Sequence, residues 1–304
     1  MSLEINNNQD ILGNISNSLQ EEVEVTGEHQ IDASQLEYGE TAYEEEGEHE
    51  HTLFAETLFN IGGFPVTNSL LTSWVAVFLI IILSLVIRVK TSRVPSRFQS
   101  FIETIIAGAY TMMDMVTNDR KKSEKIFPII FSIFIFILIN NWLGLFPGIG
   151  SITYNHTVLF RGGTADLNTT LALGLFGVIA ANIFGIVMVG GWQWFNKFVN
   201  LKTILEIPRK IGKEPTVVLI NPINFFVGLV EIISEVAKVA SLSFRLFGNV
   251  FAGEVLLASI SAMLAYGVPL PFMFLEIIVG IIQALIFAIL TLVYFTIAST
   301  EHEH

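Results

Sequence analysis

Five apolar segments dominate this sequence and restrict what it can fold into. Each is long enough to cross the hydrocarbon core of a bilayer, which is about 30 Å thick. Only 14% of the 304 residues are charged, whereas about a quarter are charged in an ordinary soluble domain. The sequence therefore predicts an all-α, polytopic membrane protein with five transmembrane helices, at about residues 69–87, 126–146, 169–191, 222–264 and 270–299.

The last two predicted helices are longer than a bilayer requires. At about 1.5 Å per residue, a helix over residues 222–264 would run about 65 Å and one over 270–299 about 45 Å. The turn Tyr266-Gly267-Val268-Pro269 separates them. Two adjacent helices of this length indicate a tilted hairpin rather than two upright anchors.

Residues 95–117 follow a different pattern. Apolar residues recur there at helical spacing, and charged residues occupy other positions. This pattern is typical of an amphipathic helix that lies along the membrane interface. Pro95-Ser96 marks its predicted start. The residues of its apolar side are Phe98, Phe101, Ile105, Met112 and Val116.

The first 56 residues carry fifteen acidic and no basic side chains, which is typical of a solvated, flexible segment. We therefore expect an acidic N-terminal extension over 1–56, before a membrane domain over 57–304. The Glu/His run at 44–51 could bind a metal ion, but ligands on a flexible run are not preorganised, so a solvated arm is favoured. No metal or other cofactor is expected, and the lack of cysteine excludes Cys-based metal or redox chemistry.

The distribution of Lys and Arg predicts the orientation of the chain. Residues 88–125 contain eight bases and residues 192–220 contain five, whereas the segments on the opposite side contain only Arg161. Positive charges collect on the cytoplasmic side of a membrane. We therefore expect the N-terminus outside and the C-terminus in the cytoplasm, which agrees with an odd number of spans.

The long segment 222–264 carries a permanent charge at Arg245, because a guanidinium does not lose its proton in a protein. At the bilayer centre such a charge costs at least about 2.5 kcal/mol, so it requires a partner, a wet cavity or another subunit. On a helix Arg245 shares one face with other polar residues, yet no acid lies within four positions of it. The polar residues of that face are Glu231, Glu235, Lys238 and Asn249, whereas Glu254 falls toward the other side.

Lys238 has acidic neighbours on its own helix. It lies three positions from Glu235 and two turns from Glu231, and either acid could neutralise it. The sequence supports such a structural ion pair as well as it supports a functional role. Arg245 differs from these residues, because its counterion must come from elsewhere.

The last predicted helix carries a polar stripe, with Glu276, Gln283 and Tyr294 on one face. A carboxyl group and an amide in an otherwise apolar helix indicate a function, although Gln283 could also make a simple interhelical hydrogen bond. Carboxyl groups such as those of Glu254 and Glu276 can pass protons, whereas Arg245 cannot. These residues together indicate a proton path with a barrier.

Four stretches of the sequence resemble one known family. Residues 241–249 (SLSFRLFGN), followed by Gly253-Glu254, resemble the signature of subunit a of the F-type ATP synthase membrane sector. Residues 282–287 (IQALIF) resemble the last-helix motif of that family. Residues 141–147 (NWLGLFP) and 165–168 (ADLN) resemble the end of its second span and its outer loop. The resemblance covers about residues 60–300.

This resemblance implies a stator that holds two proton half-channels against a rotating ring of c subunits and couples proton translocation to ATP synthesis. Arg245 would face the carboxylate of the ring, and Asn249 and Gln283 would support it. Glu254 and Glu276 would lie near the outer half-channel. The residues implied to line the outer or inner path are Asn141, Asp166, Asn168, Glu231, Glu235, Lys238 and Tyr294.

The same resemblance implies partners and a location. The partners would be the c-ring subunits, the peripheral-stalk b subunits and the rest of the ATP synthase complex, with no nucleic acid. The location would be an energy-transducing membrane, the plasma (inner) membrane of a bacterium. The sequence contains no Gly-x-x-x-x-Gly-Lys-Ser/Thr loop, so the chain itself is not expected to hydrolyse ATP.

Two alternatives stay open at this point. An ion-coupled secondary transporter would use Arg245 to bind an anionic substrate, but it would need a helix broken by Gly or Pro near that site. Residues 223–247 contain no proline and only Gly228. A purely structural anchor with buried ion pairs is the second alternative.

Overall fold

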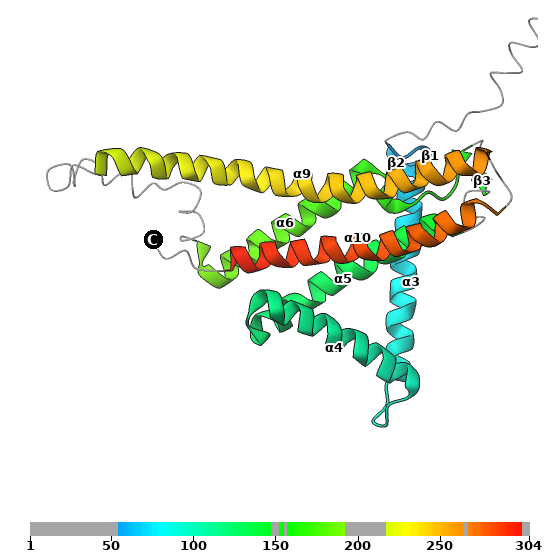
Figure 1. The fold of residues 1–304 in the computed structure, drawn as a ribbon, viewed down its shortest axis with the longest axis horizontal. Coiled ribbons are helices and arrows are strands. Elements are labelled where there is room, and N and C mark those ends of the chain that lie inside the picture. Colours follow the sequence, from blue (N-terminus) through cyan, green and yellow to red (C-terminus); the bar gives the residue numbers. More distant parts are fainter. Residues whose placement is uncertain (1–53, 147–151, 155–156, 192–216, 264–266, 300–304) are drawn as a thin grey trace, which may run out of the picture. The chain divides into compact units, whose positions relative to one another are not determined.

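The computed structural model of the chain describes residues 54–146, 152–154, 157–191, 217–263 and 267–299 (Figure 1). Within these ranges, five helices are long and apolar enough to cross a membrane, as the sequence predicts. They are α3 (Asn68–Lys90), α5 (Arg120–Leu145), α6 (Leu167–Val189), α9 (Val217–Met263) and α10 (Pro269–Ala298). The predicted extension over 1–56 lies outside the described residues up to residue 53.

Two helix starts differ from the predicted ones. α5 begins at Arg120 rather than at residue 126, because the Asp119 carboxylate accepts a hydrogen bond from the backbone N–H of Lys121 and caps a basic first turn. α9 begins at Val217, so Pro222 lies inside the helix and does not mark its start. A proline removes one backbone hydrogen bond, and here the loss affects only the first turns of the helix.

The two longest helices, α9 and α10, form the predicted hairpin. The two helices contact each other, and in Figure 1 they run side by side. At about 1.5 Å per residue α9 is about 70 Å long, more than twice the thickness of a hydrocarbon core. α3 runs across the direction of both helices in Figure 1. A bilayer that α3 crosses along its normal would therefore hold the hairpin at a steep tilt.

The core lies between the hairpin and helices α5 and α6. α6 contacts both α9 and α10, and α5 packs along α10. α6 approaches the hairpin closely because glycines face it. A Cβ at Gly174 would overlap the Ser243 hydroxyl, and one at Gly185 would overlap the backbone carbonyl of Ala298. Small residues at helix contacts in membranes allow this approach.

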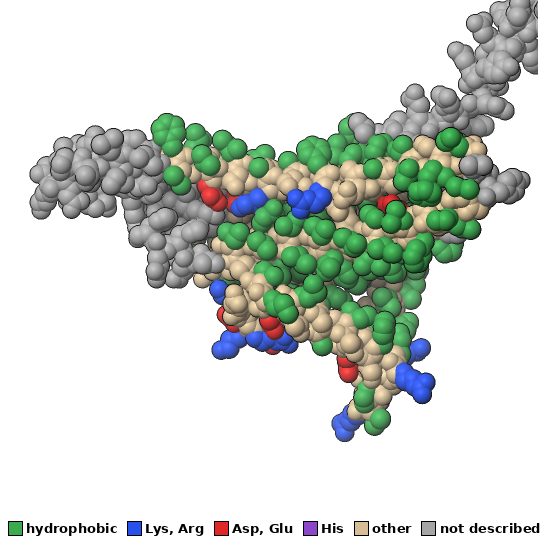
Figure 2. Space-filling model, in the orientation of Figure 1, with side chains coloured by type: hydrophobic (Ala, Val, Ile, Leu, Met, Phe, Trp, Pro, Cys, Tyr) green, Lys and Arg blue, Asp and Glu red, His purple; other side chains and the backbone are tan. Residues whose placement is uncertain are grey.

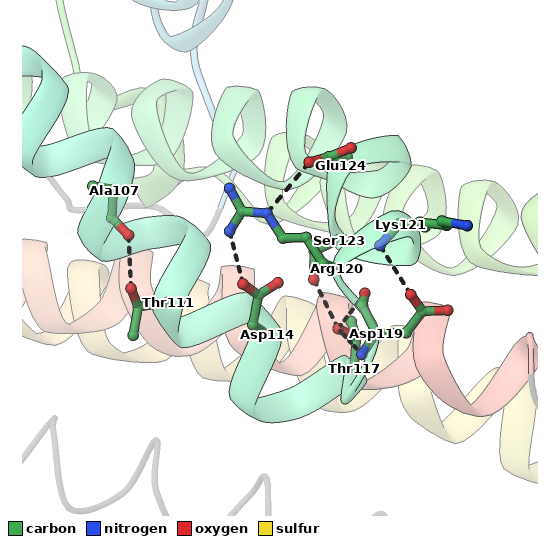
Figure 3. A network of polar contacts seen from close by, with 9 residues as sticks. All are labelled: Ala107, Thr111, Asp114, Thr117, Asp119, Arg120, Lys121, Ser123 and Glu124. Carbon is green, nitrogen blue, oxygen red and sulfur yellow. Dashed lines mark hydrogen bonds and ion pairs between the residues drawn. The ribbon is translucent and has the colours of Figure 1, made fainter.

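The predicted amphipathic helix is present as α4 (Arg97–Thr117), which packs on α5. Its placement at a membrane interface stays a prediction. Between α4 and α5, Asn118 adopts a left-handed conformation, with φ 51°. Figure 3 shows the polar contacts of this corner. The Arg120 guanidinium donates to Asp114 at 2.7 Å and to Glu124 at 3.3 Å, so it links the last turn of one helix to the first of the next.

Two small antiparallel hairpins and a 3₁₀ turn were not predicted. β1 (Thr57–Ile61) pairs with β2 (Phe64–Thr67) directly before α3, and β3 (Thr153–Tyr154) pairs with β4 (Thr157–Val158). A short 3₁₀ turn, η2 (Gly163–Ala165), then leads into α6. These elements are too short to produce a periodic pattern in the sequence. β3, β4 and η2 belong to the connection between α5 and α6, and Arg161 lies between β4 and η2.

Candidate functional site

Arg245 lies on the exposed side of α9, as expected for a cation without a partner in its own chain. Its neighbours Leu242 and Leu246 are 1% and 0% exposed and fix the opposite side of the helix in the core. The Arg245 side chain makes no hydrogen bond or ion pair with any residue that the structure describes. Figure 2 shows that charged side chains along α9 are few and are surrounded by apolar surface.

The Asn249 side chain connects α9 to α10 one turn from Arg245. Its amide donates a hydrogen bond of 2.7 Å to the Oε1 of Gln283. Asn249 is exposed, whereas Gln283 is only 2% exposed. The Gln283 Nε2 has no hydrogen-bond partner among the described residues. The buried Gln283 NH₂ group therefore keeps both of its N–H donors unpaired within the described residues, on the residue that binds Asn249.

Glu254 is bound by Arg161, a residue that lies 93 positions earlier. The Arg161 Nε lies 3.2 Å from each oxygen of the carboxylate, and its Nη2 lies 3.2 Å from Oε2. Arg161 itself is buried, at 9% exposed, and its Nη1 donates to the carbonyl of Phe54 at 3.3 Å. Helical spacing places Glu254 away from Arg245, as the sequence predicts, but it does not indicate this pair. Arg161 is the only base in the segments predicted to lie outside, and this isolation was the signal that could have indicated the ion pair.

Glu276 lies at the same end of the hairpin but has different surroundings. Its half-buried carboxylate packs directly over the backbone of Gly253, where an added Cβ would overlap it. In the described part of the chain it makes no hydrogen bond or ion pair. The two acids that the sequence grouped together therefore differ: one is held by a guanidinium and the other has both oxygens free.

Asn141 of α5 and Asp166, which directly precedes α6, hold this end of the molecule together. Asn141 donates to the carbonyl of Gly280 at 3.0 Å and accepts from the Thr164 hydroxyl at 2.6 Å. Asp166 is 3% exposed and caps α6, because it accepts hydrogen bonds from the backbone N–H groups of Asn168 and Thr169. The Asn168 side chain is exposed.

A second polar cluster lies further along the hairpin, toward the start of α9. The Lys238 ammonium donates to Glu235 at 2.7 Å, and Asn182 of α6 donates to the other carboxylate oxygen at 3.1 Å. Lys238 also lies 5.6 Å from the centre of the Tyr294 ring. A cavity of about 10 Å³ between these residues has room for one water molecule. The local ion pair that the sequence allowed is therefore formed, and Glu231 lies one turn before it.

The hairpin thus carries three polar sites in a row, with an apolar surface around them (Figure 2). The Arg161–Glu254 pair and Glu276 lie at one end, and the Glu235–Lys238 pair lies toward the other. Arg245 lies between them, with no counterion among the residues that the structure describes. This fold and site define a class of protein, a multi-pass membrane protein with an unpaired cation between two separate polar clusters.

Comparison with known proteins identifies the family within that class. The sequence model of the family described as ATP synthase A chain matches residues 70–296. The ATP synthase subunit a of Syntrophobacter fumaroxidans is 34% identical over 84% of this chain and 93% of its own length. The subunit a of Legionella pneumophila is 29% identical over 84% and 96%, and that of Mycobacterium tuberculosis is 34% identical over 78% and 89%. The chain belongs to the ATP synthase A chain family.

Proposed function

We propose that Arg245 is the fixed cation past which protons cannot flow directly, in a chain that acts as the a subunit of an ATP synthase. Membership of the family makes the chain a component of the ATP synthase complex in a membrane, where it serves as the proton-translocating stator subunit. The transporter alternative is not favoured by these relatives. The roles of the individual residues go beyond this family membership and are part of the proposal.

The single observation that carries the proposal is the isolation of Arg245. A permanent cation on an exposed, otherwise apolar helix face needs an anionic partner from outside the chain. The carboxylate of a c-ring subunit supplies that partner, because an opposite charge within a few ångströms favours its ionised form. Asn249 is exposed one turn from Arg245 and can donate to the same carboxylate, while the buried Gln283 oxygen accepts from the Asn249 amide and orients it.

The two polar clusters suit the two half-channels. Glu276 and the Arg161–Glu254 pair lie at one end, with Asn141, Asp166 and Asn168 near them, and we assign the outer half-channel to this end. The Glu235–Lys238 cluster with Tyr294 and Glu231 belongs to the inner half-channel. Because Arg245 separates the two ends, a proton cannot pass along the hairpin from one half-channel to the other. It must be carried between them by a carboxyl group of the rotating ring. One elementary charge moved through 100 mV carries about 2.3 kcal/mol, which a leak would waste.

The remaining assignments follow from this role. The partners of the chain are the c ring and the b subunits of the peripheral stalk, and the chain itself is non-catalytic. The N-terminus lies outside and the C-terminus lies in the cytoplasm of a bacterial plasma membrane, because the basic segments 88–125 and 192–220 favour that side. The acidic extension precedes the membrane domain on the outer side.

The test is Arg245→Ala in the whole complex, measured as ATP-driven proton pumping into membrane vesicles. Pumping should fall by at least about a hundredfold while the complex still assembles, because the missing cation removes an electrostatic interaction that nothing else supplies. Val236→Ala is the control, since Val236 is also exposed on the same helix and carries no charge. Normal pumping by Arg245→Ala would contradict the proposal.

The structural-anchor alternative predicts a different result. If Arg245 only stabilised the fold, its removal would lower the amount of assembled complex and leave pumping per complex unchanged. Saturable uptake of a solute by the purified chain in liposomes would instead favour a transporter.

A further inference from the structure

An apolar groove lies between α4 and the transmembrane helices α5 and α10. Its cavity measures about 460 Å³, and Thr104 is the only polar residue among those that line it. Ile105 and Met112, on the α4 side, are 41% and 42% exposed, so the described residues leave them partly uncovered. A cavity lined in this way excludes water and binds apolar ligands. The groove therefore suits an apolar occupant from outside the chain.

The groove is separate from the polar sites of the hairpin. Leu285 and Leu292 line it, and at about 100° per residue both lie on the side of α10 opposite Gln283. Gln283 faces α9, because it accepts a hydrogen bond from Asn249. A ligand in the groove would therefore bind on the other side of α10 from the contact beside Arg245.

The walls of the groove are too short for a transmembrane helix of another subunit. They cover residues 127–134 of α5 and 285–292 of α10, which is about 12 Å of each helix. A helix that crosses the bilayer needs about 30 Å of apolar surface. One leaflet of the hydrocarbon core is about 15 Å thick, so a single acyl chain matches the length of the groove. These dimensions favour a lipid chain over a protein helix.

A basic cluster lies where α3 ends and α4 begins. Residues 88–102 contain four bases and no acid, and Arg93 and Arg97 are exposed and form no ion pair with any described residue. The Lys90 ammonium lies 5.5 Å from the centre of the Phe98 ring, which places it at the first turn of α4. Figure 2 shows Lys and Arg side chains along the lower edge of the molecule, below apolar surface. Bases that cluster at the end of a transmembrane helix bind anionic lipid headgroups.

An apolar strip of α4 joins this basic cluster to the groove. Phe98, Phe101, Ile105 and Met112 recur at helical spacing on one side of α4, and all four are exposed. From Phe101 to Met112 the helix rises about 16 Å, close to the thickness of one leaflet. A phospholipid with its phosphate at the basic cluster therefore has an acyl chain long enough to follow the strip into the groove.

We propose that this groove binds an anionic phospholipid from the leaflet on the basic side of the chain. One acyl chain fills the groove, and the phosphate binds Lys90, Arg93 and Arg97. The bound chain covers apolar surface that the protein leaves open, and it supports the packing of α4 on α5 and α10. Because the lipid binds only the folded chain, it should stabilise the fold according to its occupancy.

The first test is the unfolding temperature of the purified full chain in detergent, with one of two added lipids. Dioleoyl phosphatidylglycerol and dioleoyl phosphatidylcholine have the same acyl chains, but only the first carries a net negative charge. Phosphatidylglycerol should raise the unfolding temperature by at least about 4 °C, and phosphatidylcholine by less than half as much. Equal shifts with the two lipids would overturn the proposal.

The groove itself is tested by filling it. Gly108 lines the groove, and a Cβ there meets no atom within 4 Å, so Gly108→Leu places its side chain in the cavity without a clash. This variant should lose the shift with phosphatidylglycerol. Ala107→Leu is the matched control, because Ala107 is exposed on the same helix and does not line the groove. The lipid-dependent shift is compared rather than the unfolding temperature itself, since replacing Gly also favours the helix. A full shift in Gly108→Leu would contradict the proposed site.

The headgroup contact is tested by removing bases. Arg93→Gln combined with Arg97→Gln should reduce the shift with phosphatidylglycerol to that with phosphatidylcholine. Lys121→Gln combined with Lys125→Gln is the control, because it removes two exposed bases from the start of α5 and changes the net charge equally. This second pair should leave the preference for phosphatidylglycerol intact. Equal loss in the two double variants would show a general effect of charge and would overturn the headgroup site.

A cross-linking experiment identifies the occupant in the whole complex, and it also serves if Gly108→Leu does not fold. The chain contains no cysteine, so Gly108→Cys gives it a single thiol for a benzophenone label. After irradiation in native membranes, mass spectrometry should find the labelled position joined mainly to phospholipid. Adducts mainly with another polypeptide, whether another subunit or a second copy of this chain, would overturn the proposal.

Discussion

The side chains of Asn249 and Gln283 meet at 2.7 Å, and this hydrogen bond joins α9 to α10 one helical turn from Arg245. Gln283 is buried and its second polar atom is already without a partner in the described chain. The contact therefore satisfies the Gln283 carbonyl and also fixes the spacing of the two helices beside the exposed cation.

Removal of the Asn249 amide should destabilise the hairpin. Asn249→Ala leaves the Gln283 oxygen buried without a donor, at a cost of about 1–3 kcal/mol. Thermal unfolding of the purified chain in detergent measures this loss. Asn249→Ala combined with Gln283→Leu should cost less than the sum of the two single changes, because both partners are then gone. Additive effects would show that the two side chains do not interact.

The glycines of α6 should be intolerant of added volume. In Gly185→Ala the new methyl group would overlap the backbone carbonyl of Ala298, which cannot move as a side chain can. We expect a loss of about 1–3 kcal/mol, typical of an overpacked core. The yield of monodisperse protein and its unfolding temperature measure it. Gly108→Ala serves as the control, and equal behaviour of the two variants would argue against close packing of α6 on α10.

Asp166 should stabilise the fold as a helix cap. Asp166→Ala removes the acceptor for two N–H groups of α6 and for the N–H of Ala55, which lies 3.2 Å from Oδ1. Loss of such a cap costs about 0.5–2 kcal/mol. Asp166→Asn retains one acceptor oxygen and should recover much of the stability in the same unfolding measurement. If Asn is as damaging as Ala, the charge of Asp166 matters more than its capping.

The stability contributed by the corner between α4 and α5 should decrease at acidic pH. The Ser123 hydroxyl and the Arg120 guanidinium lower the pKa of Asp114 below its ordinary value of 3.8. A carboxyl group with a lowered folded-state pKa contributes stability above its unfolded pKa, and this contribution is lost as the pH falls through the folded pKa. Asp114→Asn should therefore unfold slightly earlier than the wild type at neutral pH. The difference should begin to shrink as the pH falls below about 3.8, the ordinary pKa of Asp, and should vanish only below the lower pKa of the folded state. A constant difference down to low pH would contradict this account.

The helices of this chain could be predicted from the sequence because each apolar run is long and uninterrupted. Their ends were less predictable. α5 extends into a basic turn that no apolar pattern marks, and α9 continues through Pro222. The hairpins β1–β2 and β3–β4 escaped prediction because two to five residues do not establish a period.

At the site, contacts within one helix could be predicted from the sequence, whereas contacts between distant residues could not. The isolation of Arg245 and the contact of Glu235 with Lys238 depend on spacing along one helix, so the sequence could indicate both. The Arg161–Glu254 pair joins residues 93 positions apart, and the space for Glu276 depends on a glycine of another helix. Such contacts follow from how the elements pack, which no pattern within a single element contains.

The exposed position of Arg245 also bears on how the complex is built. If Arg245 meets a ring carboxylate as proposed, the freshly inserted chain holds this cation without that partner until the ring arrives, and a cation at the bilayer centre costs at least about 2.5 kcal/mol. The subunit without its ring would then be less stable than the assembled one, and we expect it to be degraded faster. Synthesis of the chain is thus safest when its ring is already present, so one unpaired side chain favours an order of assembly.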